Sequence, residues 1–159
     1  METCDCSRLI DGGVLLLKVD AMSLGESQAL LLRVGYGHLG CARDNHPYVV
    51  PMHYAYDSEY LYFFTTEGTK TEYIAANSEV CFQVEEVTDA SYWRSVMVIG
   101  HAERITRDAE LQSAIALIKE RNPTLTPAIN ETHIGPWKRL SKMAVYRLRP
   151  ETLYGRKTI

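Results

Sequence analysis

The fold is decided by Tyr48-Val-Val-Pro-Met-His-Tyr-Ala-Tyr56 and Tyr60-Leu-Tyr-Phe-Phe-Thr65, two runs separated only by the tight connection Asp57-Ser58-Glu59. In the first run alternate residues share a face, as in a half-buried β-strand. The second run is apolar and aromatic on both faces, which is typical of a strand buried on both sides. Because the connection is so short, we expect the two strands to be antiparallel neighbours.

Further strands flank this pair on both sides. Alternation predicts them at residues 36–43, 80–87, 92–105 and 143–148, and the turn-rich Asp44-Asn45-His46-Pro47 closes the first of these. Residues 14–19 read as a short strand or a buried arm. The sequence therefore predicts a mainly β fold, an antiparallel barrel of about six strands that is closed or nearly closed.

Two or three helices should flank the barrel. Ser23-Leu-Gly-Glu26 is a capping box, and the apolar spacing after it predicts a helix that ends near Gly35. A second apolar stripe predicts a helix that stops at Asn122, because Pro123 disfavours helical geometry in the residue before it. A third, short helix is expected at Thr69.

Length and charge limit the classes of function. The 159 residues predict a single domain, with an N-terminal arm at 1–22 and a core at 23–156. The formal net charge of −3, with no Lys/Arg run, argues against a nucleic-acid partner. Apolar runs are too short to cross a membrane, and the acidic start lacks the features of a secretory signal, so we expect a cytoplasmic protein.

The cysteines and histidines show no metal-binding pattern. Cys4-x-Cys6 lacks the spacing of a zinc site, and Cys41 and Cys81 fall within strands, so reduced, non-catalytic thiols are expected. No two histidines have ligand spacing on one face. His53 is a candidate for a substrate-facing proton donor or an axial iron ligand, against the alternative of a structural histidine.

A first candidate binding segment is Thr66-Glu-Gly-Thr-Lys-Thr-Glu72. It places Gly68 and Lys70 at a helix start, where unpaired amides and the helix dipole favour an anion such as phosphate. Thr69-x-x-Glu72 is itself a capping box, with Thr69 as the N-cap. An ordinary capped helix with a solvated lysine is the alternative.

Two other segments have chemistry that suits a flat, phosphorylated cofactor. Trp93-Arg94-Ser95 sets an indole beside a guanidinium, which suits a planar ring and a phosphate, although a core Trp beside a surface Arg has the same pattern. In Val50-Pro51-Met52, the proline has no amide for a sheet ladder, so a ligand can pair with neighbouring backbone groups. A simple edge-strand proline is the alternative.

The order of these segments resembles a known family. The matching motifs are Gly37-His-Leu-Gly40, His46-Pro-Tyr-Val-Val-Pro-Met52, Tyr62-Phe-Phe-Thr-Thr-Glu-Gly-Thr-Lys70, Val80-Cys-Phe82, Trp93-Arg-Ser-Val96-x-x-x-Gly100-x-Ala102 and the ending from Tyr146 to Lys157. Together they resemble the pyridoxamine 5′-phosphate oxidase-related split-barrel flavoproteins, most closely the branch of the 5-nitroimidazole-resistance proteins.

The resemblance implies a six-stranded split barrel that binds FMN and forms a homodimer, with each flavin at the interface. It also implies a site made from twelve residues. Val50, Pro51 and Met52 would border the isoalloxazine, and Phe64, Thr65 and Thr66 would run beneath the ribityl chain. Gly68, Thr69 and Lys70 would hold the phosphate, and Trp93, Arg94 and Ser95, from one subunit or the other, would complete the pocket.

The expected activity is reduction of small molecules, such as nitroaromatic compounds, through flavin-mediated electron or hydride transfer. Oxidation of pyridoxamine phosphate is not expected, because the ending Leu153-Tyr-Gly-Arg-Lys-Thr-Ile159 lacks the Arg-x-His pair of those oxidases. Two alternatives remain: a haem-binding or haem-degrading split barrel, and a flavin carrier or sensor without turnover.

Overall fold

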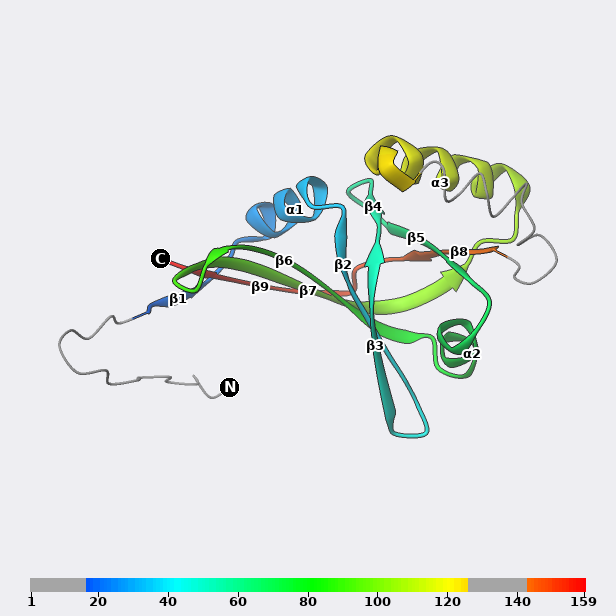
Figure 1. The fold of residues 1–159 in the computed structure, drawn as a ribbon, viewed down its shortest axis with the longest axis horizontal. Helices are drawn as coiled ribbons and strands as arrows, with labels where there is room; N and C mark the ends of the chain where they lie inside the picture. The colour runs from blue at the N-terminus through cyan, green and yellow to red at the C-terminus, as the bar shows by residue number, and fades with distance from the viewer. Residues whose placement is uncertain (1–16, 126–142) are drawn as a thin grey trace.

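A computed structural model describes residues 17–125 and 143–159 (Figure 1). Its strands are β1 (Val19–Ala21), β2 (Tyr36–Arg43), β3 (His46–His53), β4 (Ala55–Tyr56), β5 (Leu61–Thr66), β6 (Glu79–Asp89), β7 (Tyr92–Arg104), β8 (Met143–Leu148) and β9 (Thr152–Thr158). Its helices are α1 (Leu24–Arg33), α2 (Thr69–Ala76), α3 (Asp108–Arg121) and the 3₁₀ turn η1 (Pro123–Leu125). Cys4, Cys6, His133 and residues 14–16 of the predicted first strand lie outside the described ranges.

The strands form one antiparallel sheet that curls into a barrel. Its hydrogen-bonded order is β3-β2-β6-β7-β8-β5-β4, and β9 joins β1 to β7. The path is not closed, but its two ends, β3 and β4, are consecutive in the chain with only Tyr54 between them. The predicted mainly β split barrel with flanking helices is therefore confirmed. The six predicted strands are present, with the run 48–56 divided into β3 and β4, and β9 is additional. A short strand or buried arm was predicted at 14–19; β1 begins only at Val19, and residues 17–19 are exposed, so a buried arm is wrong for this part.

One edge of strand β7 pairs with β6, and its other edge is divided between β9 and β8. Residues 94–99 pair with β9, and residues 102–104 pair with β8. Gly100 lies at the change of partner, where a Cβ atom would be 2.3 Å from the carbonyl oxygen of Arg149 in the β8–β9 connection. Because that distance is far below van der Waals contact, the crossing requires a glycine.

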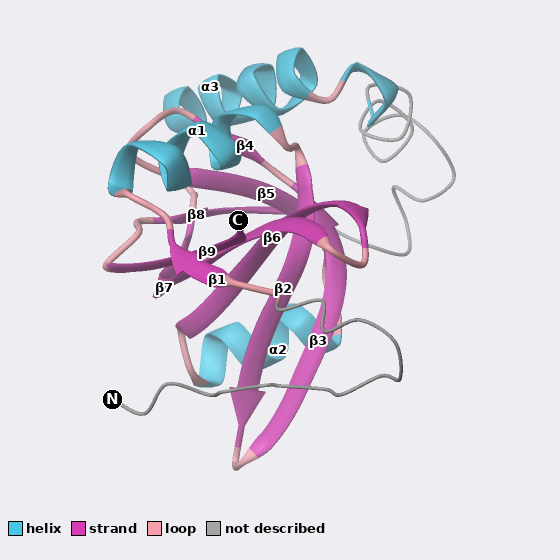
Figure 2. Ribbon diagram, turned by 90° about the vertical axis from the view of Figure 1, so that its left-hand side faces the viewer, coloured by secondary structure: helices cyan, strands magenta, loops and turns pink. Residues whose placement is uncertain are grey.

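The core fills the barrel and extends under the helices. Leu39, Phe63 and Phe82 are fully buried inside it, and the hydroxyl of buried Tyr54 donates to the carbonyl oxygen of Leu31 on α1 at 2.8 Å. A second apolar cluster lies between α3 and the sheet. Helices α1 and α3 lie on one side of the strands and α2 on the opposite side, below the barrel in Figure 2.

Two predicted helix boundaries are confirmed. The Ser23 hydroxyl accepts from the Glu26 amide at 3.2 Å, and the Glu26 carboxylate accepts from the Ser23 amide at 2.8 Å, so the capping box forms. Helix α3 ends where Pro123 predicts, and the buried amide of Asn122 donates to the carbonyl of Tyr54 at 2.8 Å. No helix among residues 17–125 and 143–159 combines the length and the apolar character that crossing a bilayer requires.

The capping box predicted for the short helix is wrong. Helix α2 begins at Thr69, one residue earlier than expected, with Gly68 as its N-cap. The hydroxyl of Thr71 bonds both backbone groups of Gly68, accepting from the N–H at 2.9 Å and donating to the carbonyl at 2.8 Å. Thr71 therefore supplies the contact that the sequence assigned to Thr69 and Glu72.

Candidate functional site

Strands β3 and β5 lie next to each other without pairing. Among the described residues, β3 pairs only with β2, and β4 covers β5 only at Leu61 and Tyr62. Since β8 occupies the other edge of β5, the described residues leave one edge of β3 and one edge of β5, beyond Tyr62, without ladder partners. The two strands contact each other. We call residues 50–52 and 63–66 on these edges the seam.

The β3 side of the seam presents backbone more than side chains. Met52 is 8% exposed and belongs to the core, and Val50 packs against that core. Pro51 is exposed on the opposite face, across from His38. Because the side chains of Val50 and Met52 point inward, these two residues can meet a ligand at the seam chiefly through backbone groups.

The β5 side combines a buried hydroxyl with an exposed one. Thr65 is buried, and its hydroxyl donates to the carbonyl of Thr66 at 3.2 Å, whereas Thr66 is exposed. The ring of Phe64 packs against the cluster under α3, on the other side of the sheet. Only the backbone of Phe64 is therefore available at the seam.

The start of α2 continues the seam with groups suited to an anion. A Cβ atom at Gly68 would meet no atom within 4 Å, so the backbone there is open to a ligand. The N–H groups of Thr69 and Lys70 have no acceptor among the described residues, as is usual in a first helical turn. Unpaired amides at a helix start, together with the charge of Lys70, form a site for an anionic group.

Lys70 is half-buried, and its charge affects the Cys41 thiol on strand β2. Burial raises the pKa of the Cys41 thiol, and the charge of Lys70 opposes that rise, which places the ammonium close to β2. The nearest upstream acid, Glu67, is engaged in an ion pair with Arg104. This pairing reduces the negative charge that an incoming anion would otherwise meet.

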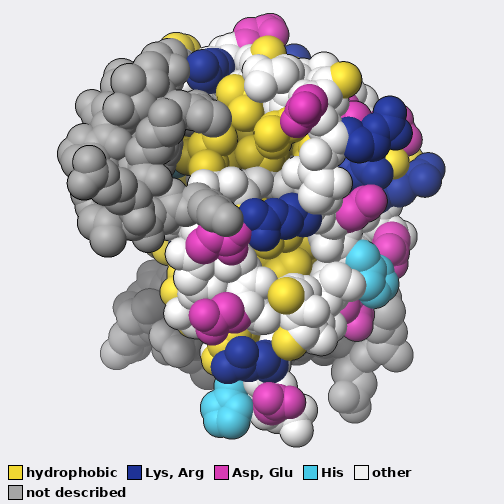
Figure 3. All heavy atoms as spheres, turned by 90° about the vertical axis from the view of Figure 1, so that its right-hand side faces the viewer, with side chains coloured by type: hydrophobic (Ala, Val, Ile, Leu, Met, Phe, Trp, Pro, Cys, Tyr) yellow, Lys and Arg dark blue, Asp and Glu magenta, His cyan; other side chains and the backbone are white. Residues whose placement is uncertain are grey.

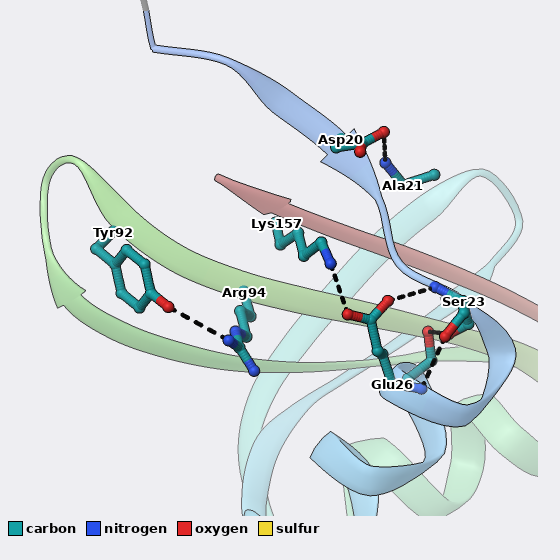
Figure 4. A network of polar contacts seen from close by, with 8 residues as sticks. Asp20, Ala21, Ser23, Glu26, Tyr92, Arg94 and Lys157 are labelled. Carbon is teal, nitrogen blue, oxygen red and sulfur yellow. Dashed lines mark hydrogen bonds and ion pairs between the residues drawn. The ribbon is translucent and has the colours of Figure 1, made fainter. Parts of the chain in front are cut away.

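Trp93, Arg94 and Ser95 lie elsewhere in the same chain. Glu67, next to Gly68, forms an ion pair with Arg104 near the end of β7. Arg94 lies ten residues before Arg104 on the same strand, and ten residues of strand span about 30 Å, so Arg94 is far from the start of α2. There the Arg94 guanidinium donates to the Tyr92 hydroxyl at 3.3 Å, close to the Lys157–Glu26 pair (Figure 4). The Trp93 amide donates to the Thr158 hydroxyl, and the Gln83 amide donates to the Ser95 hydroxyl. Within one chain, these three residues are therefore separated from the start of α2, whereas residues 50–52 and 63–66 lie on the contacting strands β3 and β5.

His53 lies at the end of β3 beside the seam. It is half-buried, and its ring makes an edge contact with Tyr36 at 5.1 Å between centroids. Within the described ranges, no three His, Cys, Asp or Glu side chains are placed to share a metal ion. His53 stays a candidate for a proton donor or an axial iron ligand, since a single axial ligand needs no such cluster.

A feature that the sequence did not indicate is a cavity of about 860 Å³ bordered by α2, the end of β7 and β8. Its lining includes Tyr146, Arg149 and His101, and none of the twelve predicted residues. Tyr146 has the pattern of a core aromatic on a closing strand, so no local signal marks it. Figure 3 shows the side of the molecule on which α2 lies, with basic and acidic side chains next to one another around exposed apolar atoms.

The fold and the sequence of this chain are similar to those of known proteins. A crystal structure of a FAD-binding protein from Mesorhizobium loti matches with a TM-score of 0.71 and 28% identity, over 90% of this chain and 98% of that one. A protein from Bacteroides thetaiotaomicron, named as a candidate 5-nitroimidazole antibiotic resistance protein, has the same fold, with a TM-score of 0.71 and 20% identity over 99% of this chain and 96% of its own. An uncharacterized protein from Rhizobium meliloti (strain 1021) is 33% identical over 87 residues, which span 55% of this chain and 58% of that relative.

The family model described as pyridoxamine 5′-phosphate oxidase matches residues 23–157. That range contains strands β2 to β8, nearly all of β9, the seam and the start of α2. The match agrees with the motifs in the sequence, and the chain belongs to the pyridoxamine 5′-phosphate oxidase family.

Proposed function

We propose that this protein binds FMN at the seam, as a homodimer, and reduces small molecules such as nitroaromatic compounds. The observation that carries the proposal is the seam itself, where β3 and β5 each leave an edge unpaired among the described residues and β5 leads into a helix start with an open glycine and a lysine. The 28% identical protein from Mesorhizobium loti is FAD-binding, which supports a flavin as the ligand. FMN is the form proposed, since the seam ends at a single anion site built around Lys70.

The residues at the seam fit the parts of a flavin. Gly68, Thr69 and Lys70 would hold the phosphate, and the hydroxyl of Thr66 lies where a ribityl chain would pass. The free backbone edge of β3 offers hydrogen-bonding groups to the polar rim of a planar ring, and Pro51 contributes no N–H. When bound, flavin supplies the hydride or electron transfer, while the protein binds and orients it. His53, at the end of β3, lies beside this edge and is the proposed proton donor to a substrate.

The homodimer is proposed from the outer face of the sheet. Cross-strand pairing sets Pro51, His38, Gln83, Met97 and Tyr154 in one row across β3, β2, β6, β7 and β9. Met97 is 39% exposed and Tyr154 is 52% exposed, so apolar area lies open on this face. Such a face suits self-association. In a dimer related by a two-fold axis, the partner's Trp93, Arg94 and Ser95 would supply the group that one chain keeps away from its own seam.

Flavin titration of the purified protein tests the cofactor and the seam together. We expect wild type to retain about one FMN per chain after desalting, and Lys70→Ala to weaken FMN binding at least tenfold, since a charge-assisted contact to phosphate is lost. Arg94→Ala should weaken it too. The controls Lys18→Ala and Arg121→Ala remove exposed cations outside the seam and should leave affinity unchanged. A wild type that refuses flavin, or binds haem instead, would contradict the proposal.

Turnover is tested separately on the reduced holoprotein. We expect reoxidation to be faster with nitroimidazoles than in buffer alone, measured anaerobically from the recovery of flavin absorbance. FMN retention with no acceleration by a panel of nitroaromatic acceptors would leave the cofactor assignment standing. It would replace the reductase with a flavin carrier or sensor.

A further inference from the structure

The cavity at the end of the barrel has an unpaired hydroxyl in its wall. Tyr146 is 3% exposed, and its ring stacks on Phe63 with 5.5 Å between centroids. Its hydroxyl has no hydrogen-bond partner among the described residues, although the side chain lines the cavity. Burial raises the pKa of Tyr146, so the hydroxyl keeps its proton at neutral pH and can donate it. Because a buried polar group without a partner is costly, this hydroxyl is suited to meet a bound acceptor.

Most charges that line the cavity are paired, and Glu72 and Arg149 are the two without an ion-pair partner among the described residues. Arg104 contacts Glu67, and the His101 ring nitrogen lies 2.8 Å from the Glu151 carboxylate. Glu103 of the same lining is held by Arg147 at 2.9 Å. Arg149 lines the cavity and makes no ion pair with a described residue. Its guanidinium is therefore available to an anionic ligand, which it can bind in a planar, two-pronged contact.

The remaining lining limits the class of ligand. Ile74, Ala75 and Ala102 give an apolar wall. Four carboxylates against two guanidiniums repel every anion, but they repel a doubly charged phosphate more strongly than a singly charged carboxylate held by Arg149. A volume of about 860 Å³ lies in the range of sites for small molecules.

From these features we infer a second binding site, distinct from the seam and independent of the proposed flavin function. It takes a small monocarboxylic acid with an apolar body. Arg149 binds the carboxylate, the Tyr146 hydroxyl donates to the ligand, and Ile74 and Ala102 contact its apolar part.

Benzoate is the probe, titrated by calorimetry and by ligand-observed NMR into the full chain with and without FMN. Wild type should bind benzoate more tightly than benzylamine or inorganic phosphate. Arg149→Ala should weaken benzoate binding at least tenfold, and Tyr146→Phe by about fivefold, as expected for one charged and one neutral contact. Arg121→Ala is the control for loss of an exposed arginine. Tyr146→Phe keeps the stacked ring, so its melting temperature should stay close to that of wild type.

The readouts separate this site from the seam. Lys70→Ala should bind benzoate like wild type, and added FMN should not displace it. The inference is overturned if wild type binds no benzoate at millimolar concentration, if both cavity variants bind it unchanged, or if FMN competes with it. None of these results depends on whether the seam binds flavin.

Discussion

At the scale of single residues, Glu26 joins two parts of the chain that are distant in sequence. Its carboxylate accepts from the Ser23 amide at 2.8 Å and from the Lys157 ammonium at 2.5 Å (Figure 4). The hydrogen bond from Lys157, followed by that from Ser23, lowers the pKa of Glu26 from 4.5 to about 2. A carboxyl with a lowered pKa in the folded state stabilises the protein above its unfolded pKa, and that contribution is lost as the pH falls through the folded value.

The prediction is that Glu26→Gln lowers the melting temperature at pH 7, and that the difference from wild type shrinks between about pH 5 and pH 2. The capping contact and the ion pair are both weakened in the variant, while protonation removes them from wild type in that window. Thermal unfolding across this pH range measures it. Glu120→Gln, an exposed glutamate on α3, is the matched control and should show no such dependence. A constant difference down to pH 2 would contradict the assignment.

Residue-level prediction from the sequence succeeded where the partners are close in the chain. The contact of Ser23 with Glu26 spans three residues, so its spacing is visible in the sequence. Lys157 lies 131 residues from Glu26, and no local pattern connects them. The same limit hid the cavity, because Tyr146 and Arg149 line it together with α2 only in the folded chain. In α2 the misassigned cap had a different cause: two threonines stand close together at the helix start, and it is the hydroxyl of Thr71, not that of Thr69, that bonds the backbone of Gly68.

At the scale of elements, two glycines should respond to alanine in opposite directions. Gly25 lies in α1, where a Cβ atom meets nothing within 4 Å. Gly25→Ala is expected to stabilise the protein by up to about 1 kcal/mol, because alanine loses less backbone entropy in a helix. Gly100→Ala must displace the backbone at Arg149, so we expect destabilisation of about 1–3 kcal/mol. Urea unfolding of both variants measures the signs, and equal effects would contradict this account of the β7 crossing.

Most elements could be predicted because their apolar periodicity is strong. The strands near 36–43, 80–87, 92–105 and 143–148 and the helices α1 and α3 all carry it. Strand β9 was missed because Thr152–Thr158 mixes a glycine with charged residues, and its position depends on pairing with residues 94–99 of β7. The division between β3 and β4 was missed because Tyr54 continues the alternation of the run.

At the scale of the whole molecule, the ordered motifs were sufficient to identify the family but not to place the site residues relative to one another. Val50, Lys70 and Arg94 all belong to the matching motifs, and nothing in the sequence shows which of them lie close together. In the structure, the length of β7 keeps Arg94 away from the other two. A site that is assembled from two copies has no signature in one sequence, because the second copy repeats the same residues. Whether the two groups meet is therefore a question of assembly.

The last prediction addresses that question through the outer face of the sheet. Met97→Asp places a charge on this face beside the exposed Tyr154, and we expect the mass in light scattering to fall from about twice 18.0 kDa to 18.0 kDa. Leu32→Asp is the matched control, because Leu32 on α1 is equally exposed, at 39%, and should leave the dimer intact. If Met97→Asp also loses FMN, the partner's Trp93, Arg94 and Ser95 complete the seam. A monomer that retains FMN would place the whole flavin site within one chain, and a monomeric wild type would contradict the dimer itself.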